Sequence, residues 1–408
     1  MHTRHRLAAG LAAPLALALL AGMQPAIAAT ELPKVTTTGN LRAYFFTRSF
    51  KSGTNQGAFS IGGKFHAESL SKRGLGVGAT YFSALPAFNS DLAQFVDKSL
   101  PGNTVNVLGE AYGQYAGDKY LVRIGRQLIK TPWAYQSDSR VIPNAFQGAA
   151  ANYNLSSNWS VYALRMARFK SRTSPTFDAN DTISTKPTSG MLAFGTTYAK
   201  GGLATQAWYY RFYGTGKLAY VDAVENIDTH TRLAPYVGAQ YVSDSGYSPR
   251  FGANIDGRAY GAKIGVGNTN VDFNLSYNNM PLTVGAFKNG GIASPYTYGD
   301  TDPLFTTSTG SGLVDKGAGH AYKLASTLWS ANRRVRFIAS RAQLFLYSNG
   351  PAGTNVLVTN LDTTVFLSKP PKGDSGKGLS IRNRWIDVDT ASTPFTFINH
   401  RLQIEYNY

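Results

Sequence analysis

The sequence has 408 residues, enough for two or three soluble domains or for one large β-barrel, and only 15% of its residues are charged, which is low for soluble domains. It contains 42 Gly, 24 Tyr, 22 Phe and no Cys, with a formal net charge of +17 and a mean hydropathy of -0.20. Beyond the N-terminus no stretch approaches the about 18 apolar residues of a membrane helix, and the lack of Cys removes thiol-based sites, so helical transporters, collagens, coiled coils and zinc fingers are excluded.

The N-terminal residues 1–28 have the three parts of a secretory signal. Arg4 and Arg6 give a positive start, residues 7–23 form an apolar run, and Ala-Ile-Ala at 26–28 matches an A-x-A cleavage site. A membrane anchor is the alternative, but the run is short and contains Pro14. We therefore expect cleavage after Ala28, a single domain over residues 29–408, and a net charge near +15 for that domain.

The rest of the chain reads as short alternating segments separated by turns, with little helical periodicity. In the segment 105–114 the alternation predicts one face with Val105, Val107, Gly109 and Ala111, and the other with Asn106, Glu110, Tyr112 and Gln114. The clearest hairpin has Tyr260, Ala262, Ile264 and Val266, a turn at 268–270, and then Val271, Phe273, Leu275 and Tyr277. Tight turns alternate with longer connections such as 171–189 and 288–318.

The C-terminal segment alternates as far as the last residue. One face carries Ile398, His400, Leu402, Ile404, Tyr406 and Tyr408, and the other carries Asn399, Arg401, Gln403, Glu405 and Asn407. A last strand that ends on an aromatic residue is similar to the sorting signal of bacterial outer-membrane proteins.

These patterns predict an all-β fold, a transmembrane antiparallel β-barrel. Lipid cannot satisfy free backbone polar groups, so a chain without apolar helices can span a membrane only as a closed barrel. At about ten residues per strand the chain suits about 16 to 18 strands, with short periplasmic turns and long outer loops. A barrel of that size encloses an aqueous lumen, so a channel is the expected function.

Arginines are predicted to gather on the inner face where the first and last strands meet. The alternation places Arg42, Arg48, Arg382, Arg384 and Arg401 on that face. Guanidinium groups match carboxylates bidentately, so we interpret this set as a basic ladder along which anions could move. Two alternatives stay open: the arginines balance lumen carboxylates such as Glu405, Asp387 and Asp389, or they bind lipopolysaccharide phosphates from the loops.

Several segments together resemble a known family. Residues 123–127 (RIGRQ), 131–132 (TP) and 139–148 (SRVIPNAFQG) resemble the third-loop region of OprD-type (Occ) substrate-specific porins. GLGVGATY at 74–81 resembles the Gly-rich second strand of these porins, and 41–50 and 381–384 resemble their terminal strands. The resemblance spans nearly the whole chain after residue 28.

This resemblance implies an 18-stranded, monomeric or loosely trimeric barrel in the outer membrane, narrowed by inward-folded loops. It implies passage of small carboxylate-bearing solutes, including amino acids and aromatic acids, along a basic ladder. On position the five arginines match that ladder and Arg140 matches an Arg at the constriction. For the opposing acidic pocket the chain offers Asp300 and Asp302, which could equally be solvated turn formers. The chain is short for the family, which suggests trimmed outer loops and a wider constriction.

Other functions remain as alternatives. An oligosaccharide porin would use an aromatic slide, for which Tyr162, Tyr210 and Tyr213 are candidates. An outer-membrane hydrolase would need a His close to a catalytic partner, and none is close in sequence; a structural or adhesive barrel would have a plugged lumen. We expect no enzyme activity, no metal and no cofactor, and the partners expected are carboxylate solutes, outer-membrane lipid and lipopolysaccharide rather than nucleic acid.

Overall fold

The computed structural model describes residues 34–87, 100–137, 139–229, 231–297, 301–347, 355–368, 377–390 and 396–408. Residues 35–408 form one compact unit, and the expected signal peptide at residues 1–28 lies outside the described residues. None of the helices in the described ranges has the length and apolar character needed to cross a membrane.

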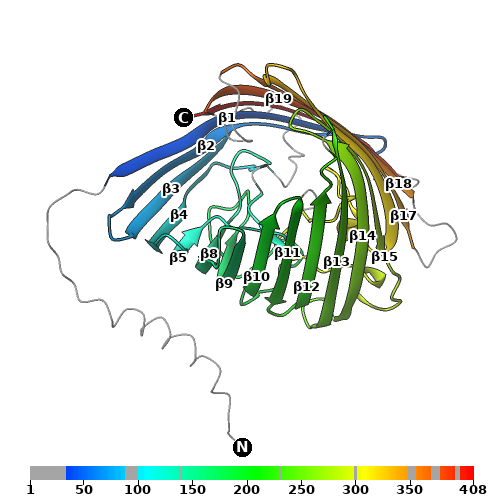
Figure 1. Cartoon of the computed structure of the whole chain (residues 1–408), viewed down its shortest axis with the longest axis horizontal. Coiled ribbons are helices and arrows are strands. Elements are labelled where there is room, and N and C mark those ends of the chain that lie inside the picture. Colours follow the sequence, from blue (N-terminus) through cyan, green and yellow to red (C-terminus); the bar gives the residue numbers. More distant parts are fainter. Residues whose placement is uncertain are drawn as a thin grey trace, which may run out of the picture. The chain divides into compact units, whose positions relative to one another are not determined.

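The strands of this unit alternate with turns and loops along the whole chain (Figure 1). The first half contains β1 (Val35–Phe50), β2 (Gln56–Leu70), β3 (Leu75–Pro86), β4 (Val105–Ala116), β5 (Tyr120–Gln127), β6 (Lys130–Thr131), β7 (Ala134–Tyr135), β8 (Ala145–Asn154), β9 (Trp159–Lys170) and β10 (Met191–Lys200). The second half contains β11 (Leu203–Phe212), β12 (Gly216–Asn226), β13 (Ala234–Ser248), β14 (Ala253–Gly267), β15 (Val271–Met280), β16 (Gly319–Trp329), β17 (Val335–Leu346), β18 (Asn355–Phe366), β19 (Gly378–Thr390) and β20 (Phe397–Asn407). A 3-10 turn, η2 (Phe287–Asn289), and a one-turn helix, α2 (Leu313–Lys316), interrupt the connection between β15 and β16.

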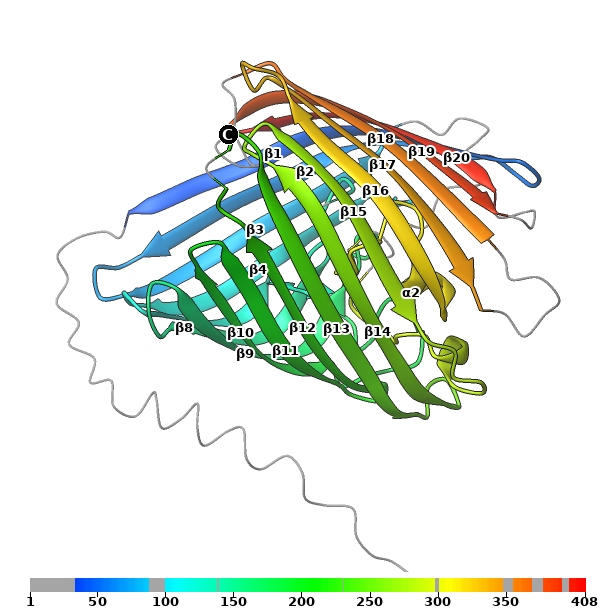
Figure 2. The same ribbon diagram turned by 45° about the vertical axis from the view of Figure 1, so that its right-hand side comes forward.

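Eighteen of these strands form one closed antiparallel barrel, which confirms the predicted fold class. Each strand pairs with its neighbours in the chain, and β1 closes the barrel by pairing with β20 over the register Asn40↔Asn407 to Phe50↔Phe397. Figure 2 shows the blue N-terminal strands beside the red C-terminal ones and the strands running obliquely around the wall. The short strands β6 and β7 pair only with each other, inside the connection between β5 and β8.

Side chains alternate between the lumen and the outside because successive residues of a strand point to opposite faces. The outside carries many exposed apolar side chains, among them Leu41, Phe45, Ile61, Phe65, Val77, Ile124, Phe194, Tyr209, Ile264 and Leu324. Exposure of so many apolar groups on one continuous surface is typical of a barrel surrounded by lipid. The predicted hairpin with its turn at 268–270 is present as β14 and β15, and the last strand is β20.

Because β4 contains a β-bulge, the two faces predicted for the segment 105–114 are partly wrong. Thr80 pairs with Glu110 but Tyr81 pairs with Leu108, so Gly109 is an extra residue. A bulge shifts the alternation by one residue. As a result Val105 and Val107 face the interior together with Glu110, Tyr112 and Gln114, which were predicted on the opposite face. The Gly-rich segment 74–81 also falls largely on the third strand, β3, rather than the second.

The two ends of the barrel differ in their connections. At the end where β1 begins and β20 ends the connections are short turns, such as 71–74, 117–119, 201–202 and 268–270. At the other end the connections include three long ones, 128–144, 171–190 and 281–318. This asymmetry matches short periplasmic turns and longer outer loops.

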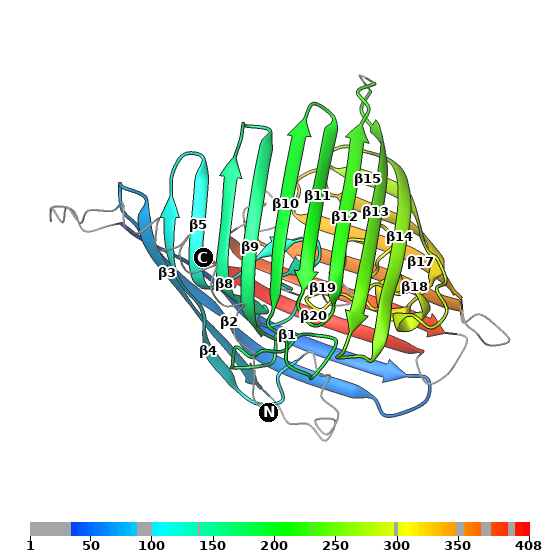
Figure 3. The same ribbon diagram turned by 90° about the horizontal axis from the view of Figure 1, so that it is seen from below.

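Parts of the long connections pack against the inner wall. Trp133 and Tyr296 are almost fully buried, in a cluster with inward residues of the strands such as Phe146, Met191 and Tyr210. Val141 and Ile142 pack in a second cluster against the inner face of β1, β3 and β4. In Figure 1 the connection between β5 and β8 lies within the ring of strands, and Figure 3 shows the wall of β8 to β14 side by side. Burial of aromatic groups holds these loops inside the lumen.

Candidate functional site

A cavity of about 1040 Å³ lies in the lumen near the end with the short turns. Its wall is formed by inward residues of β1 to β5 and β17 to β20, and the loop 128–144 contributes Leu128, Lys130 and Gln136. Seven basic side chains line it, namely Arg42, Lys64, Arg123, Lys130, Arg336, Lys377 and Arg382. Among the described residues three carboxylate side chains do so, Glu68, Glu110 and Glu405, so the described side chains that line the cavity carry an excess of four positive charges.

The five ladder arginines expected from the sequence lie on three neighbouring strands and on the inner face. Arg42 is opposite Glu405 in the β1–β20 register, and two residues further along β20, Gln403 is opposite Arg382 of β19. The next inward-facing residue of β20 is Arg401, which is opposite Arg384 of β19. The one after it is Asn399, which is opposite Arg48 of β1. The arginines therefore occupy four successive inward levels along the seam where the barrel closes.

Arg42 joins the wall to the inward loop. Its Nη2 donates to Glu405 Oε1 at 2.7 Å, and its Nη1 donates to the backbone carbonyl oxygen of Arg140. Arg42 is only 4% exposed, so this guanidinium is held between the last strand and the loop 128–144. Because the charged Arg42 side chain bonds to both the wall and the loop, it fixes the position of the loop relative to the arginines of the closing seam.

The carboxylate that balances the β19 arginines is Asp362, on β18. Arg382 Nε donates to Asp362 Oδ1 at 2.9 Å, its Nη2 donates to Oδ2, and Arg384 Nε donates to Oδ2 at 3.1 Å. The two carboxylates proposed for this role from the sequence, Asp387 and Asp389, alternate with the inward-facing Ile386 and Val388 and so face outward. Their assignment to the lumen was wrong, whereas Glu405 does face the lumen.

Three arginines surround one buried phenylalanine. The guanidinium carbons of Arg48, Arg140 and Arg401 lie 5.3, 5.8 and 5.7 Å from the centre of the Phe46 ring, which is fully buried. The face of an aromatic ring attracts cations, which lowers the cost of placing like charges close together. Arg140, expected at a constriction, thus lies beside the ladder, and it donates to the carbonyl oxygen of its neighbour Ser139 at 3.0 Å.

The acidic side of the cavity lies on β2 to β5. Glu68 accepts a hydrogen bond from the Tyr112 hydroxyl at 2.7 Å and lies 3.4 Å from Arg123 Nη2. Glu110 accepts hydrogen bonds from the Thr80 hydroxyl and, at 3.1 Å, from the backbone N–H of Leu128. The cavity therefore presents oxygen acceptors on one side and guanidinium donors on another.

Buried polar contacts hold the inward loop in place. Asn144 accepts from the backbone N–H of Ser137 and donates to the carbonyl of Tyr135 at 2.9 Å, which closes the loop on itself. Arg172, from the next long connection, donates to the hydroxyls of Ser137 and Ser139 at 3.1 and 3.0 Å. Because these bonds join segments far apart in the sequence, no local pattern predicts them.

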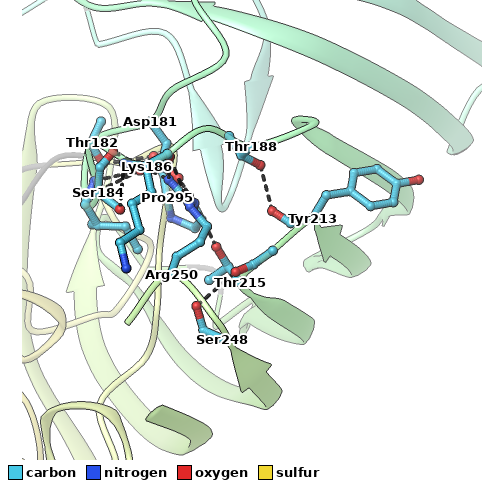
Figure 4. Close-up of polar contacts among 12 residues, drawn as sticks. Asp181, Thr182, Ser184, Lys186, Thr188, Tyr213, Thr215, Ser248, Arg250 and Pro295 are labelled. Atoms are coloured by element: carbon cyan, nitrogen blue, oxygen red, sulfur yellow. Dashed lines mark hydrogen bonds and ion pairs between the residues drawn. The ribbon is translucent and has the colours of Figure 1, made fainter. Parts of the chain in front are cut away.

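A second polar cluster ties the outer connections together (Figure 4). Arg250 forms a buried ion pair with Asp181 and donates to the carbonyl of Lys186 at 2.6 Å and to the Thr215 hydroxyl at 3.1 Å. Thr182 donates from its hydroxyl to the carbonyl of Pro295 at 2.9 Å. Four connections, 171–190, 213–215, 249–252 and 281–318, are therefore held by one network.

Of the two residues of the expected acidic pocket, the described one, Asp302, does not line the cavity. Asp300 is outside the described residues, and Asp302 is buried in the connection 281–318, away from the residues that line the cavity. Asp302 Oδ1 accepts from the backbone N–H of Leu304 at 3.2 Å and from the Thr307 hydroxyl. Its burial raises the pKa of the Asp302 carboxyl from an ordinary 3.8 to about 7.

A row of stacked aromatic rings follows the inner face of β9 and β11. Tyr162 stacks on Trp208, Trp208 on Tyr210, and Tyr210 on Phe212, with centroids 5.4, 5.8 and 5.4 Å apart. Tyr162 and Trp208 also line a recess of about 360 Å³ next to Lys130. Tyr213, the third tyrosine of the aromatic slide considered from the sequence, belongs instead to the outer connection 213–215.

The sequence reasoning missed several lining residues. Arg123 and Arg336 alternate with the outward-facing Ile124 and Phe337. The alternation of inward and outward residues along a strand therefore predicts that both arginines face the lumen. Lys130 depends on the path of an inward loop, which alternation does not describe. Within the described ranges no three His, Cys, Asp or Glu side chains are placed to hold a metal ion.

No protein-family model matches the sequence, and no curated protein matches it. Solved structures do match. Acinetobacter baumannii OccAB4 has 15% identity and a TM-score of 0.78, and the match covers 92% of this chain and 98% of that chain. A BenF-like porin from Pseudomonas fluorescens Pf-5 has 12% identity, the same coverage and a TM-score of 0.78. Pseudomonas aeruginosa OpdK, solved with vanillate, has 14% identity, the same coverage and a TM-score of 0.74.

The fold of this chain is therefore that of the OprD-type (Occ) porins, as the sequence resemblance predicts. The match covers 98 to 99% of those solved chains, so it extends over the whole barrel. The expectation of trimmed outer loops and a wider constriction stays a prediction.

Proposed function

We propose that this chain, with the fold of the OprD-type porins, is an outer-membrane porin for passive, selective diffusion of small carboxylate-bearing solutes. The observation that carries the proposal is the positively charged lumen cavity beside the arginines of the closing seam. The exposed apolar outside and the fold support a place in the outer membrane.

The size of the cavity makes its charge strong. One unit charge in 1040 Å³ corresponds to about 1.6 M, so four excess cations far exceed the about 0.15 M of physiological salt. Mobile anions must enter to balance this charge, and cations are excluded. A carboxylate is favoured over a simple anion because the guanidinium of Arg382, which is more exposed than that of Arg42, can offer it paired N–H donors.

Movement through the site needs binding that is weak at each step. Asp362 already accepts bonds from Arg382, so a solute carboxylate exchanges with an existing partner rather than entering an empty, tight site. Glu68 and Glu110 lie on the same cavity and can accept bonds from a solute amino group. Amino acids and other small organic acids are thus the solutes that fit best.

The test is single-channel recording in a planar bilayer under a salt gradient. We expect an open pore with an anion-selective reversal potential, and current block by small carboxylates. Arg382→Ala with Arg384→Ala should weaken block by carboxylates more than block by neutral sugars. A matched control removes two outward-facing cations, Arg258→Ala with Arg341→Ala, and should leave block unchanged.

A closed lumen or a cation-selective pore would contradict the proposal. If Arg382→Ala with Arg384→Ala weakened block by carboxylates and block by sugars equally, these arginines would not select for carboxylates.

The second candidate function is an oligosaccharide porin. The stacked row from Tyr162 to Phe212 supports it, because flat rings offer a sequence of stacking surfaces to sugars. Only Tyr162 and Trp208 of that row line the recess, and Tyr210 is fully buried. Current block by neutral oligosaccharides stronger than that by carboxylates would favour this candidate.

A further inference from the structure

The outside of the barrel carries a row of cations that have no contact with the lumen. In the register of β9 to β12, Arg165 is opposite Leu192, Leu192 is opposite Arg211, and Arg211 is opposite Lys217. These residues alternate with Leu164, Met191, Tyr210 and Leu218, all of which are buried in the inner cluster. Arg165, Arg211 and Lys217 therefore face outward, in one line across four neighbouring strands.

This basic row lies at the edge of the apolar outer surface. Phe194 and Tyr209 lie two residues closer to the short turns than Leu192 and Arg211 do. They are opposite each other on β10 and β11, face outward, and are well exposed. On the other side of the row the strands end and the outer connections begin, at 171–190 and 213–215. Cations directly beyond the aromatic residues of a membrane barrel are at the depth of lipid headgroups rather than of acyl chains.

Among the residues that the structure describes, no carboxylate balances this row. Among the described residues none of Arg165, Arg211 and Lys217 forms an ion pair with an acidic side chain. The next acidic residue in the same row, Asp256, is two strands beyond Lys217 and pairs with Arg258 at 3.5 Å. Like charges directly opposite each other destabilise an antiparallel pair, so Arg211 and Lys217 gain from a bound anion.

The guanidinium groups are positioned rather than free to turn away. Arg165 Nη1 donates to the carbonyl of Met191 at 3.4 Å, and the Tyr213 ring lies between Arg165 and Arg211, 4.9 and 5.4 Å from their guanidinium carbons. The Tyr213 backbone is fixed because its carbonyl accepts from the Thr188 hydroxyl at 2.6 Å. Figure 4 shows its ring pointing away from the Arg250 cluster.

We propose that Arg165, Arg211 and Lys217 form a binding site for the phosphate groups of a phosphorylated glycolipid in the outer leaflet. Two guanidinium forks and an ammonium match the charge and the acceptor geometry of a phosphate monoester, and the adjacent apolar surface receives the acyl chains. Exposed Arg168, also outward on β9, extends the basic surface toward β8. The site rests on the proposed outer-membrane location, with the long connections on the outer side.

The experiment is a titration of the purified full chain in detergent with bis-phosphorylated lipid A, followed by native mass spectrometry. The variant is Arg165→Gln with Arg211→Gln and Lys217→Gln. Loss of charge-assisted bonds should raise its apparent Kd for lipid A about tenfold or more. The matched control removes three outward or turn cations elsewhere, Arg258→Gln, Arg334→Gln and Arg341→Gln, and should bind as the wild type does.

Three results would overturn the site. They are unchanged binding in the row variant, equal weakening in the control, and equal binding of lipid A from which both phosphates have been removed. Inorganic phosphate tested alone should bind far more weakly than lipid A, because it lacks acyl chains; equal affinity would mean a free-anion site and would also reject the proposal. Heat-modifiable mobility on gels confirms that each variant is folded.

Bilayer recordings on the same preparations keep the two proposals apart. A conducting, anion-selective wild type whose lipid A binding ignores the row would end this inference alone. Row-dependent lipid A binding by a chain that never conducts would end the porin proposal and leave the site.

Discussion

Asp302 makes the packing of the connection 281–318 depend on pH. Burial raises the pKa of its carboxyl from 3.8 to about 7; the nearby Asp315 also raises it, and Lys323 lowers it. Between these two pH values the packed loop keeps the proton, whereas the opened loop releases it. Packing is therefore strongest below pH 3.8, weakens as pH rises, and stops changing above about pH 7.

The size of this effect follows from the two pKa values. Loop packing loses about 1.4 kcal/mol for each pH unit in this window, or about 4 kcal/mol in all. Between pH 5 and pH 7 the loss is about 2.3 kcal/mol, a factor of about 50 in the opening equilibrium, because the carboxyl of the packed loop is itself half ionised at pH 7. Asp302→Asn keeps an oxygen for the bonds from Leu304 and Thr307 but cannot ionise.

Hydrogen exchange with mass spectrometry measures the opening directly. The amides to follow are those of Leu304, Thr306 and Thr307, which donate to Asp302, to Asn278 and to the carbonyl of Leu304. Protection factors, which correct for the intrinsic pH dependence of exchange, should fall about 50-fold from pH 5 to pH 7 in the wild type and stay constant in Asp302→Asn. The same fall in both proteins, or no fall in the wild type, would refute the reasoning.

Three further predictions concern other polar and aromatic groups. Arg250→Met leaves Asp181 buried without its counter-charge and should destabilise the outer connections by about 3–5 kcal/mol, seen as faster proteolysis there, and adding Asp181→Asn should restore part of the resistance. Asp362→Asn frees Arg382 and should make the reversal potential more anion-selective; a shift toward cations would contradict this. Trp208→Ala should weaken current block by neutral oligosaccharides and leave carboxylate block unchanged, so a loss of carboxylate block would assign the recess to the acid pathway.

The barrel could be predicted because its signal is local. Alternation within single strands places Arg42 and Arg401 on the inner face, and the closing of a barrel brings the first and last strands together. The same alternation places Asp387 outward once Arg382 is inward, so the outward position of Asp387 is also a local property of the sequence.

Features that depend on distant contacts could not be predicted. The bulge at Gly109 reverses the faces of the rest of β4, and it is visible only from the pairing with β3. The position of the inward loop depends on Arg172 bonds to Ser137, between two irregular segments. Burial of Asp302 likewise follows from loop packing, for which the sequence has no periodic signal.

The pairing of β1 with β20 has a consequence for how the protein is made. The Arg42–Glu405 contact joins residues 363 positions apart, so its formation carries the loop-closure entropy of nearly the whole chain. Contacts of such high sequence separation form late and slowly. The inward arginines of β1, β19 and β20 come from both sides of this seam. A chain stalled before its last strand is translated would have neither a closed wall nor the complete set of these arginines.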